Sequence, residues 1–213
     1  TPAHIKAFVE RLGSTSFVRQ KIQPKSVVVT EEKDESKNHL WRKLEEGKKV
    51  IAVELDSPKN ADLSGFMESA RRLQTAGVDT LTIADCPIAV ARMDSALLAC
   101  KVKRELGLDV IPHMTCRDRN INALLLGMHA EEIYNILAIT GDPIPNAQRN
   151  EVSSVYQFNS RKLAAYIDSL NAEVFDEGYK IYGALNVNAK NFEVELRRAE
   201  QKIEHGMVGS LTH

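Results

Sequence analysis

From residue 49 onwards, short apolar runs alternate with amphipathic stretches of helical length. The apolar runs predict six strands, at residues 50–55, 80–84, 109–115, 136–139, 180–185 and 208–212. The stretches between them predict helices at 63–76, 91–106, 121–131, 160–175 and 192–205, and several of these are followed directly by glycine. Strands that alternate with helices indicate βαβ units and therefore a parallel sheet.

The first 38 residues follow a different pattern. An apolar stripe predicts an amphipathic helix at 2–12, and the sequence of 13–38 resembles a linker, with a charged run at 31–37. Asn38 is a suitable N-cap for a helix at 39–46. We therefore expect a helical appendage, a linker and then one main domain.

Six strands with five crossover helices fit either a doubly wound sheet or most of a (β/α)8 barrel. The chain has no GxGxxG after any strand and no GxxxxGK[ST], so the nucleotide-binding motifs of doubly wound folds are absent. A barrel draws one or two groups from many strand ends into a single site. Polar residues do end strand after strand here: Glu54 and Asp56, Thr82 and Asp85, His113 and Thr115, Asp142, and Asn186.

We accordingly predict an α/β fold in which residues 39–213 form an incomplete (β/α)8 TIM barrel of about six strands. Two βα units would be needed to close it, and an open barrel leaves two unpaired strand edges. The chain would then be part of a longer protein, or something else would complete the barrel.

The stretch 134–145, YNILAITGDPIP, places one carboxylate directly after a buried strand. Its apolar run ends at Gly141-Asp142-Pro143, where glycine allows a turn and proline cannot continue a ladder. Ligands of α/β folds bind at this end of the sheet, which favours a functional Asp142. The alternative is that Asp142 only caps the turn.

Composition narrows the function further. The net charge of −1 gives no indication of nucleic acid or a membrane surface as a partner, and no apolar run is long enough to span a bilayer. Three cysteines without a CxxC, and an N-terminal TPAHIKAFVERL without an apolar signal region, predict a cytoplasmic location. Residues 113–116, HMTC, offer at most half a metal site, so we predict no metal.

Several strand ends together resemble the methylenetetrahydrofolate reductase family, and most closely the reductase half of bacterial bifunctional homocysteine methyltransferase/methylenetetrahydrofolate reductases. The resemblance covers roughly residues 45 to 212 in order. Residues 1–12 are similar to the helix that follows the zinc-binding motif of the methyltransferase domain. The motifs are AVELDSP (52–58), LTIADCP (81–87), IPHMTCRDRN (111–120), LAITGDP (137–143) and GALNVNAKNFEVELRRAEQKIEHG (183–206).

The resemblance implies an FAD-dependent barrel enzyme of one-carbon and methionine metabolism that reduces 5,10-methylenetetrahydrofolate to 5-methyltetrahydrofolate. NADH, NADPH or a partner protein would reduce the flavin. Glu54 matches the acid that protonates N10 of the folate, and Asp142 matches the aspartate beside flavin and pterin. Glu54 lies between apolar residues, so we expect it to be desolvated. His213 stands where the family has a folate-binding Gln.

The resemblance also implies the flavin contacts, which are Thr82, His113, Thr140, Gly141, Asp142, Arg198 and Lys202. Arg198 and Lys202 are one helical turn apart and share a face, where surface charge is the simpler explanation. Thr140 stands where relatives can have Arg. Arg117, Asp118 and Arg119 are expected to form an ion-pair cluster at the barrel mouth, without an assigned role.

Two other functions stay open at this point. The chain could be a non-catalytic remnant that binds flavin or folate, or a partner subunit, and His213 and the missing strands favour this. It could also be an unrelated barrel enzyme acting on a phosphorylated metabolite. A homo-oligomer is compatible with every reading.

Overall fold

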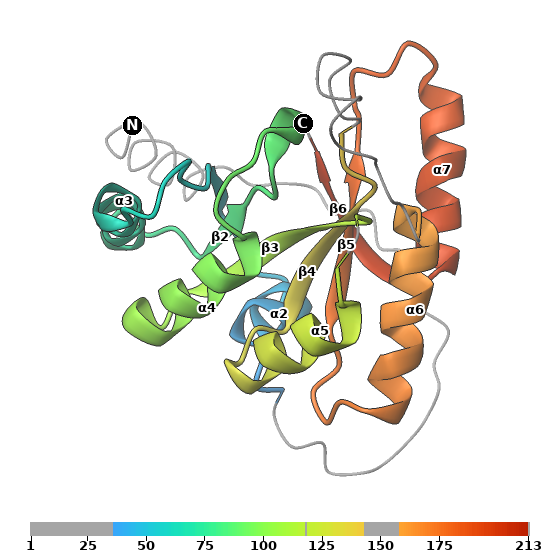
Figure 1. The fold of residues 1–213 in the computed structure, drawn as a ribbon. Coiled ribbons are helices and arrows are strands. Elements are labelled where there is room, and N and C mark those ends of the chain that lie inside the picture. Colours follow the sequence, from blue (N-terminus) through green and yellow to red (C-terminus); the bar gives the residue numbers. More distant parts are fainter. Residues whose placement is uncertain (1–35, 118, 143–157, 213) are drawn as a thin grey trace.

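The structure is a computed structural model that describes residues 36–117, 119–142 and 158–212 (Figure 1). Its strands are β1 (Ala52–Leu55), β2 (Thr80–Ile83), β3 (Asp109–Thr115), β4 (Asn135–Ile139), β5 (Lys180–Leu185) and β6 (Met207–Thr212). Its helices are α2 (His39–Glu45), α3 (Ser64–Thr75), the 3₁₀ turn η1 (Pro87–Ala89), α4 (Ser95–Leu106), α5 (Ile121–Ala130), α6 (Ser160–Glu173) and α7 (Phe192–Glu204). The helix expected at 2–12 lies outside the described residues.

The strands form one parallel sheet in the order β1-β2-β3-β4-β5-β6. Each strand pairs with the next one in the chain, and a helix follows on the outer side of the curled sheet (Figure 1). This is the arrangement of consecutive units of a (β/α)8 barrel, so the predicted incomplete barrel is confirmed. Among the described residues no strand pairs with the outer edge of β1 or of β6.

Side chains that alternate along the strands build two separate cores. The outward set, including Leu81, Ile83 and Ile136, packs under the helices in one large cluster. The inward set forms a smaller cluster inside the curled sheet, whose buried members are Leu40, Ile111, Leu137 and Tyr182. Because successive strand residues point to opposite faces, the same short runs supply both cores.

Helix α2 closes the amino-terminal end of the strands. Asn38 caps the helix by accepting from the Trp41 N–H at 3.0 Å, and its amide exchanges two hydrogen bonds with Asn135 at 2.9 and 3.1 Å. The Leu40 N–H donates to Asp109 at 2.8 Å, while the Leu40 side chain enters the inner core. The inner core is therefore sealed at one end, and the carboxyl ends of the strands lie at the other.

The segment between β2 and α4 differs from the prediction. The helix expected from residue 91 begins at Ser95, because the Asp94 side chain caps it by accepting from two backbone N–H groups at 2.9 and 3.1 Å. Upstream, Cys86, Ile88 and Ala89 have left-handed backbone, with φ of 48°, 57° and 55°. The other elements agree with the predicted ranges within about two residues at each end, the usual uncertainty of helix boundaries.

None of the helices in the described ranges is long and apolar enough to cross a membrane.

The seal at the amino-terminal end generates a stability prediction. Leu40 is 2% exposed, whereas Leu44, one turn further along α2, is 36% exposed. Leu40→Ala should lower the free energy of unfolding by about 2–4 kcal/mol, because it opens a cavity in the inner core. Leu44→Ala should cost less than about 1 kcal/mol. Urea denaturation measures both, and equal losses would contradict the assigned role of α2.

Candidate functional site

A cleft of about 310 Å³ opens at the carboxyl ends of the first four strands. The residues that line it end a strand or follow one closely, as expected for a barrel site. They are Glu54, Ala84, Asp85, Pro87, His113, Thr115, Ile139, Gly141 and Asp142. The structure therefore brings Glu54, His113, Gly141 and Asp142 together, although they come from three different strands.

Glu54 and His113 face each other across the first strands of the cleft. The Glu54 Oε2 atom lies 3.8 Å from His113 Nε2, and Thr82, buried, is the register partner of Glu54 on β2. The His113 carbonyl accepts from Ser95 Oγ at 2.7 Å, which ties the end of β3 to the start of α4. This spacing is within ion-pair range but longer than a hydrogen bond, so direct proton transfer would require the two groups to approach or a water to bridge them.

The expected desolvation of Glu54 is absent in this structure. The Glu54 side chain is 51% exposed, while that of His113 is 6% exposed. The reason is the position of β1 at the edge of the sheet, with no strand beyond it among the described residues. Apolar neighbours along the strand point to the other face and therefore cannot shield Glu54.

Asp142 lies past the end of β4 and is held at two of its atoms. Its carboxylate Oδ2 accepts from the Ile88 N–H at 2.7 Å, and its carbonyl oxygen accepts from Arg117 at 2.6 Å. Gly141, just before it, has φ of +90°, a conformation that L side chains rarely adopt. Gly141 and Asp142 therefore form a turn, as expected if Asp142 only caps it. The same turn also places Asp142 at the cleft.

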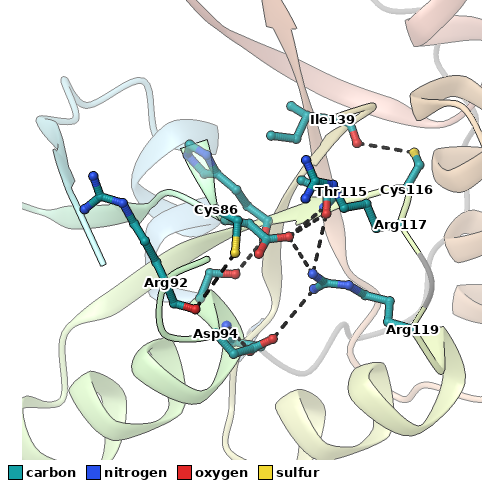
Figure 2. A network of polar contacts seen from close by, with 12 residues as sticks. Cys86, Arg92, Asp94, Thr115, Cys116, Arg117, Arg119 and Ile139 are labelled. Atoms are coloured by element: carbon teal, nitrogen blue, oxygen red, sulfur yellow. Dashed lines mark hydrogen bonds and ion pairs between the residues drawn. The ribbon is translucent and has the colours of Figure 1, made fainter. Parts of the chain in front are cut away.

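Asp85 is the centre of a buried polar network beside the cleft. Figure 2 shows this network and labels Thr115, Arg119 and Asp94. Its side chain is 2% exposed and accepts from the Thr115 N–H at 3.2 Å, the Thr115 hydroxyl at 2.7 Å and Arg119 at 2.6 Å. A second nitrogen of Arg119 lies 3.8 Å from Asp94. The sequence marked Asp85 and Thr115 as strand-end residues but gave no sign of this pairing.

A second pocket, of about 350 Å³, lies at the ends of β4 and β5. It is lined by Thr140, Asn159, Ser160, Arg161, Glu195, Arg198, Gln201 and Lys202, so that three cationic side chains face one carboxylate. Arg198 and Lys202 do share this pocket, as their spacing predicts. Arg161 and Gln201 were missed, because they come from different helices and meet only in the fold.

Glu195 and Lys202 of this pocket form hydrogen bonds with backbone groups at the end of β5. Glu195 is buried, accepts from the Asn186 N–H at 3.3 Å and lies 3.4 Å from Arg198. Lys202 donates to the Ala184 carbonyl. Partial burial lowers the pKa of Lys202 below its usual value. An anion in the pocket would favour the charged form of Lys202 and offset the effect of burial on its pKa.

Three consecutive residues at the end of β4 are divided between the linings of the two pockets. Thr140 lines the cationic pocket, while Gly141 and Asp142 line the cleft. A single ligand with an anionic part and a ring system could therefore occupy both.

His113 and Cys116 of the HMTC motif lie on opposite sides of the chain at the end of β3. His113 lines the cleft, whereas Cys116 packs into the outer core on the opposite face of β3. Burial raises the pKa of the Cys116 thiol to about 11, and the thiol donates to the Ile139 carbonyl at 3.2 Å. No group of three His, Cys, Asp or Glu side chains suited to a metal was found in the described part of the chain. His213 and Asp118 lie outside it.

A curled parallel sheet with polar side chains gathered at its carboxyl ends is the arrangement of a barrel enzyme. Residues 39–212 match the family model of methylenetetrahydrofolate reductase, and the chain therefore belongs to the methylenetetrahydrofolate reductase family. Membership supports an oxidoreductase acting on a folate. No curated protein matches the chain. The likeness to the bacterial bifunctional branch stays a prediction.

The turn at Gly141 can be tested against a glycine that should tolerate a side chain. A Cβ at Gly141 would lie 3.1 Å from the Thr115 side chain, on a backbone with φ of +90°. Gly141→Ala should therefore destabilise the protein by about 1–3 kcal/mol. Gly127, inside α5, has nothing within 4 Å of such a Cβ. Gly127→Ala should stabilise it by about 0.5–1 kcal/mol. Thermal unfolding distinguishes the two, and a tolerated alanine at Gly141 would contradict the assigned turn.

Proposed function

We propose that this chain is an FAD-dependent reductase that converts 5,10-methylenetetrahydrofolate to 5-methyltetrahydrofolate, with NADH or NADPH as electron donor. The observation that carries the proposal is that a cationic pocket and a cleft with Glu54, His113 and Asp142 are lined by consecutive residues at the end of β4, in a member of this family. An anionic cofactor in one pocket would then reach the reacting groups in the other.

The donor set of the cationic pocket fits the diphosphate of FAD. Arg161, Arg198 and Lys202 are the residues that would hold it, because phosphate groups favour such cations. Ser160, the first residue of α6, lines the same pocket, although its N–H donates to Thr140 and the Lys162 N–H donates to the Asn159 cap. Thr82, His113 and Gly141 would lie towards the flavin ring. Bound FAD would supply the hydride that the folate receives.

Glu54 is the residue that we assign as the acid. The five-membered ring of the folate must open to an iminium before hydride can reach it, and ring opening requires a proton on N10. The half-exposed carboxyl group of Glu54 is accessible to a substrate, and a folate bound over it would remove it from water and favour its protonated form. His113, 3.8 Å away, would exchange the proton through a bridging water or after a small approach of the two side chains.

Asp142 is assigned to binding and orientation of the folate. A carboxylate at this position can accept from the N–H groups of a pterin ring and influence the electronics of the flavin. His213, also assigned to the folate, lies outside the described residues.

One observation favours a second candidate, a flavin- or folate-binding module without catalysis. The outer edge of β1 carries no further strand among the described residues, and Glu54 beside it is exposed. A folate held on only one side would bind without being aligned for hydride transfer.

An absorbance spectrum of the purified chain separates the two candidates. We expect the spectrum of oxidised flavin, bleached by NADH or NADPH under anaerobic conditions and restored by methylenetetrahydrofolate. A flavin that binds but never cycles would establish the second candidate. Absence of flavin after reconstitution with FAD would overturn both as flavoproteins.

The acid assignment has its own test. Glu54→Gln should abolish folate reduction, because a carboxamide is far too weak an acid to protonate N10, and should leave flavin reduction by the nicotinamide donor intact. Glu45→Gln, an exposed position on α2 at the opposite end of the strands, is the matched control and should leave both half-reactions unchanged. Stopped-flow absorbance follows each half-reaction. Folate reduction by Glu54→Gln at the normal rate would remove Glu54 from this role.

A further inference from the structure

The segment Arg117 to Arg119, which follows β3, has no role in the function proposed so far. Both arginines reach back to groups beside the cleft, but to different ones. Arg117 donates to the Asp142 carbonyl at 2.6 Å, and Arg119 donates to the Asp85 carboxylate at 2.6 Å. Neither arginine lines the cleft. They therefore act on the cleft through other residues.

The bond from Arg119 fixes the start of the turn after β2. Asp85 receives three donors and is almost fully buried, so its position is closely determined. Arg119 also lies 3.8 Å from Asp94, the cap of α4, so one guanidinium joins both ends of the segment between β2 and α4 (Figure 2).

The segment held in this way orients the Asp142 carboxylate. Ile88, three residues after Asp85, donates its N–H to Asp142 Oδ2 at 2.7 Å. Its φ of 57° is unusual for a β-branched residue, and such a conformation persists only where the surroundings determine it. The Ile88 side chain is 71% exposed, so its own packing does not fix the conformation. The contacts that hold this segment are those of Asp85 and Asp94 with Arg119, the bond from Ile88 to Asp142, and two bonds from Arg92 and Met93 to the carbonyl groups of Ser57 and Pro58.

We propose that Arg117, Arg119 and Asp85 are positioning residues for Asp142. Arg117 fixes the backbone of Asp142, while Arg119 and Asp85 fix the turn whose Ile88 N–H orients its carboxylate. The proposal rests on the proposed function only for the consequence that this orientation matters to the folate reaction.

The structural part is tested by NMR of the full chain labelled with ¹⁵N-isoleucine. An N–H that donates to a carboxylate resonates downfield, so the Ile88 amide, identified by its loss in Ile88→Val, should do so. Asp142→Asn should move it upfield. Asp85→Asn and Arg119→Met should also shift the Ile88 amide resonance, although the described hydrogen bond of the Ile88 N–H goes to Asp142 and not to either of these residues. An unchanged Ile88 signal in both variants would overturn the proposal.

Lys103→Met is the matched control for loss of a buried cation. Lys103 is 9% exposed and pairs with Asp109 at 2.7 Å, at the amino-terminal start of β3. Its loss should lower the thermal unfolding temperature while leaving the Ile88 amide in place. Arg119→Lys, which keeps the charge, should move that amide less than Arg119→Met does. If Lys103→Met shifted the Ile88 amide resonance as far as Arg119→Met does, the shift would reflect a general loss of stability, and the proposal would fail.

The catalytic part is tested by a double-mutant cycle. Asp85→Asn or Arg117→Met should each lower kcat for folate reduction by about 10- to 100-fold, since small displacements of a positioned group have effects of that size. In an Asp142→Ala background the same changes should have little further effect, because their target is gone. Full additivity would overturn the proposal. The NMR test needs no cofactor or substrate, so a failure of the proposed function is distinguishable from a failure of the positioning role.

Discussion

A curled parallel sheet has to bury both of its faces, and this constraint determines where chemistry can occur in the molecule. The outer face is covered by α3 to α7. The inner face packs its own side chains against Leu40 of α2 and leaves a pocket of about 440 Å³ between α2 and the strands. Largely buried polar groups at the amino-terminal ends are paired with one another, as in Asn38 with Asn135 and Lys103 with Asp109, whereas the polar groups at the carboxyl ends line open pockets. The cleft and the cationic pocket both lie there.

The buried Asp85 carboxylate is the most demanding group in that polar region. Removing one carboxylate from water costs several kcal/mol, unless charged and neutral donors replace the water. Thr115 and Arg119 provide these donors, and both lie on or just after β3. The ends of β2 and β3 are thereby coupled, and the left-handed turn at Ile88 is kept in a conformation that it would not adopt alone.

Much of this arrangement could be predicted because the determining signals are local. Apolar runs and glycine stops located the strands and helices, and Asn38 was recognisable as a cap. The strand-end residues Glu54, His113 and Asp142 were identified because parallel strands end at one edge. The start of α4 was misplaced, since an earlier start at residue 91 and a cap at Asp94 are both compatible with the local pattern.

Other features depend on contacts that a local pattern does not contain. The exposure of Glu54 follows from the edge position of β1, which is a property of the whole sheet. Arg117 and Arg119 are two residues apart, yet their partners Asp142 and Asp85 are 25 and 34 residues away in opposite directions along the chain. In the described part of the chain Arg119 pairs with Asp85 and Asp94, while Arg117 donates to a backbone carbonyl, so the two arginines contact different partners.

The cationic pocket shows how a fold can supply a charge that the local motif lacks. Thr140 stands where relatives can have an arginine, and from the sequence this left a phosphate contact at that position in doubt. In the structure the Thr140 hydroxyl accepts from the Ser160 N–H at 3.4 Å, at the start of α6. Arg161, the next residue, lines the same pocket as Arg198 and Lys202 of α7. The positive charge opposite Thr140 thus comes from α6 and α7, the two helices that follow in the chain. The end of β4 then needs only to place its backbone at the edge of the pocket.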